Sequence, residues 1–276
     1  MKKILCVLLV FLFQYSHACS SVEEAMEFGL RGKRFVLLYF TSQPAEAVNS
    51  NKFEFKSSED DEYLYDNYVE FVVYSNANKK YLKQFNVSEL PTMLIIDGYG
   101  KEAFRYIPKN DSENLILVLK NFVLPKNFNI DNINQFMAKK NATSALRIAQ
   151  SYLDYSLLVD TAYRINIVQL SNQYLQEAEK YSKNAETVQR IKLLQLSQLA
   201  YLQSYAELQT KLYAWSEKDI FSNNINHFYF LKLLVSAAVD TPHLAEIKQK
   251  IQTRNDFDSY ATKANQLVSA QNLVVN

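Results

Sequence analysis

The sequence predicts an α/β domain followed by an all-α region, either a helical bundle or a short solenoid. Short apolar runs alternate with helical segments in the first half of the chain. From Asp131 onward there is no glycine and a single proline, and apolar residues recur at helical spacing. A length of 276 residues is sufficient for two domains.

The first half contains four expected strands, each too short for a helix and rich in apolar or β-branched residues. Helices are expected before, between and after them, beginning at Ser21, Ala45, Ser58, Lys79 and Asp111 or Ser112. The last two strands form a hairpin through the turn 98–101. The expected strands are Phe35–Ser42, Glu70–Ser75, Pro91–Asp97 and Glu102–Ile107.

The all-α region is expected to contain about five helices. Their packing on one another would bury the apolar stripes, as in a bundle or solenoid. Trp215 is expected to pack at a helix end. The helix breaks are placed near Asn141, Asp160, Asn184, 219–223 and Thr241–Pro242.

Composition and charge exclude several classes of ligand. The net charge is +1 without any basic block, so neither nucleic acid nor an anionic membrane surface is an expected partner. No cofactor is expected. No metal site is expected either, because His227 and His243 are far apart without a cysteine or acid motif. The acidic run 59–62 is interpreted as the first turn of a helix, where adjacent acids point in different directions.

The amino terminus is typical of a secretory signal peptide covering residues 1–18. Lys2 and Lys3 precede an apolar stretch, 4–13, that is too short to span a membrane. Small residues at Ser16 and Ala18 then fit a cleavage site. We therefore expect an exported protein, located in the periplasm.

Cysteine is scarce, and its position leaves two interpretations open. Cys6 lies inside the expected signal peptide, and Cys19 would be the first mature residue. Cys19 is either incidental or the lipid-modified residue of a membrane-anchored lipoprotein. Ser16 stands where such lipoproteins usually carry an aliphatic residue. The mature chain cannot form an internal disulfide, and membrane contact is expected only if Cys19 is acylated.

The first half resembles the thioredoxin superfamily. The matching elements are the strand FVLLYFTS at 35–42, the segment from Val87 to Pro91-Thr92, and the turn Gly100-Lys101-Glu102. The resemblance covers about 21–125. It implies a thioredoxin-like domain at 19–125, followed by the helical domain at 126–276.

The residues that carry thioredoxin chemistry are missing. The resemblance aligns the two active-site cysteines with Ala45 and Val48, or with Pro44 and Ala47 after a one-residue shift. The buried acid of the family aligns with Tyr39. Without a thiolate, the chain has no nucleophile for disulfide exchange at this place.

The resemblance also implies that Pro91 is cis and that the backbone before it pairs with an extended peptide. Two interpretations remain open: Pro91 only preserves the geometry of the fold, or this region still binds a peptide. The candidate peptide-binding residues are Ser42, Gln43, Pro44, Ala45, Leu90, Pro91 and Thr92.

These features predict a redox-inactive thioredoxin-like exported protein that acts as a binding, adaptor or chaperone-like module for a protein or peptide partner. No catalytic residue is assigned. Two alternatives remain: a thioredoxin-family disulfide oxidoreductase that uses Cys19 as a lone thiol, and a structural lipoprotein of the cell envelope.

Overall fold

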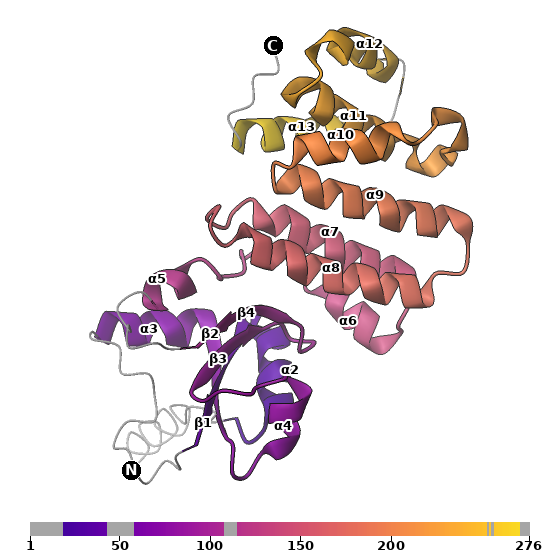
Figure 1. Ribbon diagram of the computed structural model, residues 1–276. Coiled ribbons are helices and arrows are strands. Elements are labelled where there is room, and N and C mark those ends of the chain that lie inside the picture. The colour runs from indigo at the N-terminus through magenta and orange to yellow at the C-terminus, as the bar shows by residue number, and fades with distance from the viewer. Residues whose placement is uncertain (1–18, 43–57, 108–114, 253, 255–256, 271–276) are drawn as a thin grey trace, which may run out of the picture.

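The computed structural model describes residues 19–42, 58–107, 115–252, 254 and 257–270. A small mixed sheet with its helices is followed by an all-helical region, which confirms the expected order of the two fold classes (Figure 1). The expected signal peptide and the helix expected from Ala45 lie outside the described residues.

The sheet has four strands in the order β2-β1-β3-β4. β1 pairs in parallel with β2 and antiparallel with β3, and β3 and β4 form the predicted antiparallel hairpin. Gly100 in the hairpin turn has φ +84°, a conformation that favours glycine. The strands are β1 Phe35–Thr41, β2 Tyr68–Tyr74, β3 Thr92–Ile96 and β4 Glu102–Tyr106.

The helices expected near Ser21, Ser58 and Lys79 are present, whereas the start expected at Asp111 or Ser112 lies outside the described residues. The Ser21 hydroxyl caps the first of them by accepting a hydrogen bond from the Glu24 amide at 3.1 Å. This helix ends at Gly32, and Lys33 adopts the left-handed conformation after it. The described helices are α2 Val22–Gly32, α3 Ser58–Asn67, α4 Lys79–Gln84 and α5 Leu115–Lys120.

The sheet is buried on both faces, which explains why β1 is a continuous apolar run. Val36, Leu38 and Phe40 pack with α2 and α4 on one face. Phe35 and Leu37 point to the other face and belong to the same core as the helical region. The strands therefore connect two hydrophobic cores, one of which continues into the second half of the chain.

The helical region begins at α6. Eight α-helices lie within the described part of residues 131–270, so the prediction of about five was too low. One missed break separates α9 from α10, where Gln203 has φ 62°. Glycine is the usual residue at such a position, and its absence removed the sequence signal for a helix end. The helices are α6 Asp131–Ala138, α7 Ala142–Ser156, α8 Arg164–Tyr181, α9 Ala185–Tyr201, α10 Tyr205–Tyr213, α11 Ile225–Ala238, α12 Thr241–Gln252 and α13 Asp258–Ala270.

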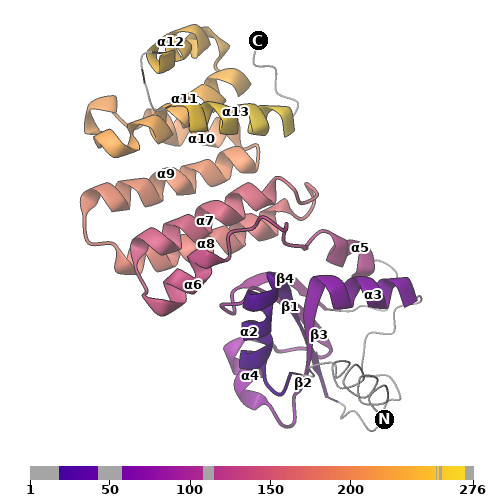
Figure 2. The ribbon, with the colours of Figure 1, turned by 180° about the vertical axis from the view of Figure 1, so that it is seen from behind.

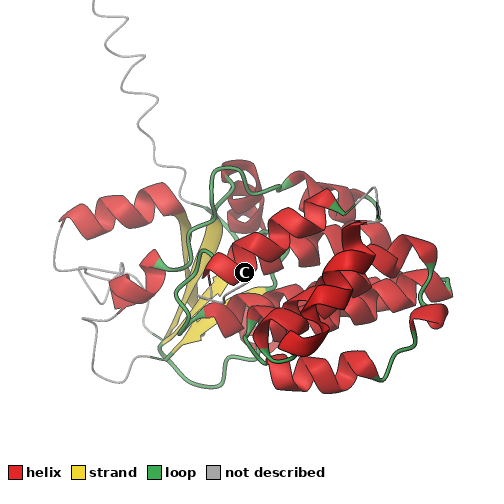
Figure 3. Ribbon diagram, turned by 90° about the horizontal axis from the view of Figure 1, so that it is seen from above, coloured by secondary structure: helices red, strands yellow, loops and turns green. Residues whose placement is uncertain are grey.

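Successive helices pack on their neighbours in sequence from α7 to α12, an arrangement typical of a short solenoid. α6, α7 and α8 lie next to the sheet, and the later helices stack farther from it (Figures 1 and 2). Seen from above, the strands lie to one side of the helical stack (Figure 3). Trp215 packs against the common core, as expected.

A buried carboxylate joins the sheet to α7 and α8. Asp97 follows β3 directly and is 1% exposed. Its Oδ1 accepts the backbone N–H groups of Tyr99 and Lys101, both at 2.9 Å. Its Oδ2 accepts the hydroxyl of Tyr152 at 3.0 Å and the hydroxyl of Tyr174 at 2.5 Å. Four donors thus satisfy both oxygens of a side chain that water does not reach.

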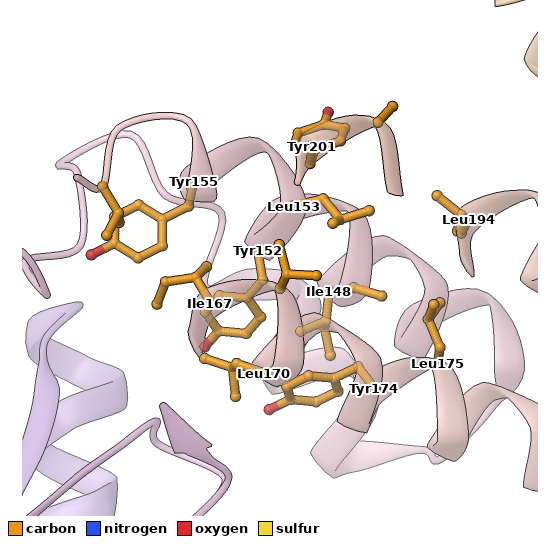
Figure 4. Packing of buried hydrophobic residues seen from close by; sticks show 14 of the residues in the cluster. Ile148, Tyr152, Leu153, Tyr155, Ile167, Leu170, Tyr174, Leu175, Leu194 and Tyr201 are labelled. Carbon is orange, nitrogen blue, oxygen red and sulfur yellow. The ribbon is translucent and has the colours of Figure 1, made fainter. Parts of the chain in front are cut away.

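The two tyrosines come from different helices and stack on each other. The rings of Tyr152 in α7 and Tyr174 in α8 lie 5.7 Å apart with an interplanar angle of 23°. Both hydroxyl ends project toward the strands (Figure 4). Burial raises the pKa of the Asp97 carboxyl, although the four donors act in the opposite direction.

Two further contacts surround this junction. The Lys101 ammonium lies 2.8 Å from the Glu177 carboxylate, and the Gln173 amide donates to the backbone carbonyl of Glu102 at 2.8 Å. The Lys101–Glu177 pair is largely buried, with 21% and 10% of the side chains exposed. The β3–β4 hairpin is therefore fixed to α8 through both its main chain and its side chains.

Replacing Asp97 by alanine should destabilise the whole chain. The substitution leaves two buried phenol hydroxyls without an acceptor, which costs about 3 kcal/mol or more in the free energy of unfolding. Urea unfolding followed by circular dichroism measures this change. The control is Asp66→Ala, which removes an exposed carboxylate and should change stability by no more than about 0.5 kcal/mol. Equal stability of the two variants would contradict this role of Asp97.

Candidate functional site

The predicted peptide-binding residues lie at one end of the sheet, where β1 ends and β3 begins. Phe40 pairs with Thr92 in the antiparallel register, so the chain after Phe40 and the chain before Thr92 leave the ladder side by side. The Leu90–Pro91 bond is cis. Thr92 is buried, and its hydroxyl donates to the Glu89 carbonyl at 2.7 Å.

Leu90 is the exposed apolar side chain of this end, with 40% of its surface accessible. Ser42 follows β1, and its carbonyl accepts from the Asn76 side-chain amide at 3.3 Å. Gln43, Pro44 and Ala45 lie outside the described residues. The structure therefore brings Leu90, Pro91 and Thr92 to the end of the sheet where β1 stops at Thr41.

Neither cysteine nor histidine occurs at 39–42 or 89–92, the described segments of this site. Tyr39 stands where the resemblance expects a buried acid, and burial raises the pKa of its hydroxyl. The sequence has only two cysteines, Cys6 and Cys19. A phenol that remains protonated at neutral pH cannot act there as a carboxylate base.

Cys19 is half-buried on the side of the sheet that α2 and α4 cover. Only Lys33 and Arg34 join α2 to β1, so α2 runs antiparallel to β1. Because Cys19 precedes the start of α2, it lies toward the end of the sheet where β1 stops. The hydroxyl of Tyr81 in α4 donates to Glu23 in the first turn of α2. Cys19 itself packs against the apolar core that Phe40 shares with α2 and α4.

The environment of Cys19 disfavours reactivity. Burial and, second to it, the negative charge of Glu24 raise the pKa of the thiol. Because the thiolate is the nucleophile in disulfide exchange, a raised pKa reduces the reactive fraction at neutral pH.

No family model and no curated protein matches this chain. Its function is therefore argued from its own residues. In the described part of the chain, no three His, Cys, Asp or Glu side chains converge as a metal site. None of the described helices is long and apolar enough to cross a membrane.

Sequence reasoning missed one buried polar pair. Ser197 in α9 and His227 in α11 lie 2.7 Å apart, measured from Oγ to Nε2. The Ser197 Oγ also lies 3.1 Å from the Leu193 carbonyl, and the histidine tautomer decides which of the two accepts the hydroxyl proton. Both side chains are buried, with Ser197 2% and His227 5% exposed, and each provides the other with a hydrogen-bond partner in the core.

Burial keeps His227 neutral. It lowers the pKa of the imidazole to about 3, and the positive charges of Lys263 and Arg190 act in the same direction. The Tyr260 ring, 5.7 Å away and inclined by 29°, stacks on it. Below the ordinary histidine pKa, the unfolded chain binds a proton at this position that the folded chain excludes.

This difference predicts a pH dependence of stability. The contribution of His227 is fully present above about pH 6.5 and is lost as the pH falls toward 3. Between pH 6 and 5, the free energy of unfolding should fall by about 1 kcal/mol more in the wild type than in His227→Gln. Urea titrations at both pH values measure the two slopes.

His243→Gln provides the control. His243 Nδ1 lies 2.7 Å from the Asp240 carboxylate, and this hydrogen bond raises the pKa of His243. His243 therefore contributes to stability with the opposite sign. Its contribution is present below the pKa of the unfolded chain and is lost as the pH rises through the pKa of the folded chain. Equal acid slopes in the wild type and His227→Gln would show that the buried imidazole is protonated in the folded chain.

Proposed function

We propose that this chain is a redox-inactive thioredoxin-like protein, and that the end of its sheet around Leu90 and Pro91 binds an extended segment of a protein partner. One observation carries the proposal: the family's sulfur positions after β1 hold no cysteine, while the entry into β3 keeps Pro91 and Thr92. A disulfide oxidoreductase cannot work without its thiols, whereas a binding protein can.

The order of helices and strands supports the thioredoxin-like part of the proposal. It agrees with the order on which the resemblance rests, including the antiparallel β3–β4 hairpin after Pro91. The pairing of Phe40 with Thr92 also supports a common surface for the two segments, because it sets the end of β1 beside the start of β3.

Export to the periplasm belongs to the same proposal. Its support is the basic and apolar pattern of residues 1–18, followed by Cys19. Intact-mass measurement of the mature protein distinguishes a free Cys19 from an acylated one. An acyl group would favour the structural lipoprotein of the cell envelope.

Binding of unfolded protein should depend on Leu90. Leu90→Asp places a charge on the proposed apolar contact and should weaken binding of a reduced, alkylated unfolded protein about tenfold or more. Fluorescence anisotropy of the labelled unfolded protein measures the affinity. Leu117→Asp is the matched control, because Leu117 is an exposed leucine on α5. The absence of binding by the wild type, or equal loss in both variants, would exclude this surface.

The chain should not reduce disulfides. In an insulin-reduction assay with dithiothreitol, we expect the wild type and Cys19→Ser to give the background rate. Activity that disappears in Cys19→Ser would support the oxidoreductase alternative. Activity that survives the substitution would contradict both functions.

A further inference from the structure

A polar cavity of about 390 Å³ lies in the helical region, among α6, α7, α9, α11 and α13. Its volume is within the range of small-molecule sites, but most of its lining is polar, unlike the largely apolar lining of typical ligand pockets. We call it the arginine pocket, and its lining includes Asn132, Arg147, Gln150, Arg190, His227 and Tyr260.

Two cationic side chains from different helices line this pocket. Arg147 belongs to α7 and Arg190 to α9. Among the described residues, neither guanidinium forms an ion pair, and no carboxylate lines the cavity. The nearby Asp154 accepts from Lys263 at 2.7 Å and from the Tyr201 hydroxyl at 2.7 Å. The positive charge of the pocket is therefore not neutralised by the residues that line it.

The side chain of Asn132 in α6 borders the same pocket. Asn132 is 8% exposed and lines the cavity, and its side chain has no hydrogen-bond partner among the residues that the structure describes. The polar atoms of Asn132 are not sealed from solvent, so water or a bound molecule in the cavity can pair with them.

The pKa of His227, which lines the pocket, responds to the positive charges around it. After burial, the charges of Lys263 and Arg190 are the next causes that lower the pKa of His227. A neutral His227 adds no charge of its own at pH 7. The cations that face it are thus Arg190 from α9 and Lys263 from α13, with Arg147 of α7 in the same pocket.

We propose that the arginine pocket binds a small oxyanion, a carboxylate or phosphate group, between Arg147 and Arg190. The guanidinium fork presents paired N–H donors that match either group. The amide of Asn132 supplies a further donor, and Gln150 borders the same space. This site is separate from the partner-binding surface around Leu90, so the two proposals stand or fall independently.

Isothermal titration of the full chain tests the site with two probes, inorganic phosphate and succinate. Ionic strength is held constant with sodium chloride, so that general screening is not mistaken for binding. We expect saturable binding of at least one probe. Arg147→Gln and Arg190→Gln should each weaken that binding about tenfold or more, because each removes a charged hydrogen-bond donor.

Lys192→Gln is the matched control. Lys192 is also exposed on α9, but two residues along a helix point to different sides, so this variant should bind as the wild type does. Thermal melts without ligand verify that the arginine variants fold, and Leu90→Asp should bind both probes normally.

The outcomes separate the two chemistries. Binding of phosphate alone assigns a phosphate ligand, and binding of succinate alone assigns a carboxylate ligand. The proposal is overturned if neither probe saturates, or if both arginine variants bind as tightly as the wild type.

Discussion

The hydrogen-bonded carboxylate of Asp97 is the constraint on which the arrangement of this protein depends. A carboxylate removed from water is costly unless donors surround it. The hairpin turn provides two backbone donors, but the second oxygen requires Tyr152 and Tyr174 from α7 and α8. The second oxygen of Asp97 is thus hydrogen-bonded only when α7 and α8 lie against the sheet.

The hydrophobic core imposes the same arrangement. Phe35 and Leu37 of β1 face a core that continues into α7 and α8, and the opposite face packs on α2 and α4. Leu90 lies exposed at the end of the sheet. The arginine pocket lies elsewhere, among the helices that extend from the junction. Two candidate binding surfaces are therefore carried by one continuous structure.

Local features of this fold could be predicted from the sequence, and long-range ones could not. The strands were evident because an apolar run of seven residues is too short for a helix. Asp97 looked like an ordinary strand end, because its two tyrosine donors follow 55 and 77 residues later. The presence of Arg147 and Arg190 in the lining of one cavity is hidden for the same reason. The end of α9 was missed because Gln203, rather than glycine, takes the left-handed position.

Native-state hydrogen exchange tests most directly whether Asp97 joins the sheet and the helices into one folding unit. The account predicts that the slowest amides of β1 and of α7 open with the same free energy, and that Asp97→Ala lowers both by the same amount. Different opening free energies in the wild type, or a loss confined to one of the two elements in the variant, would contradict it.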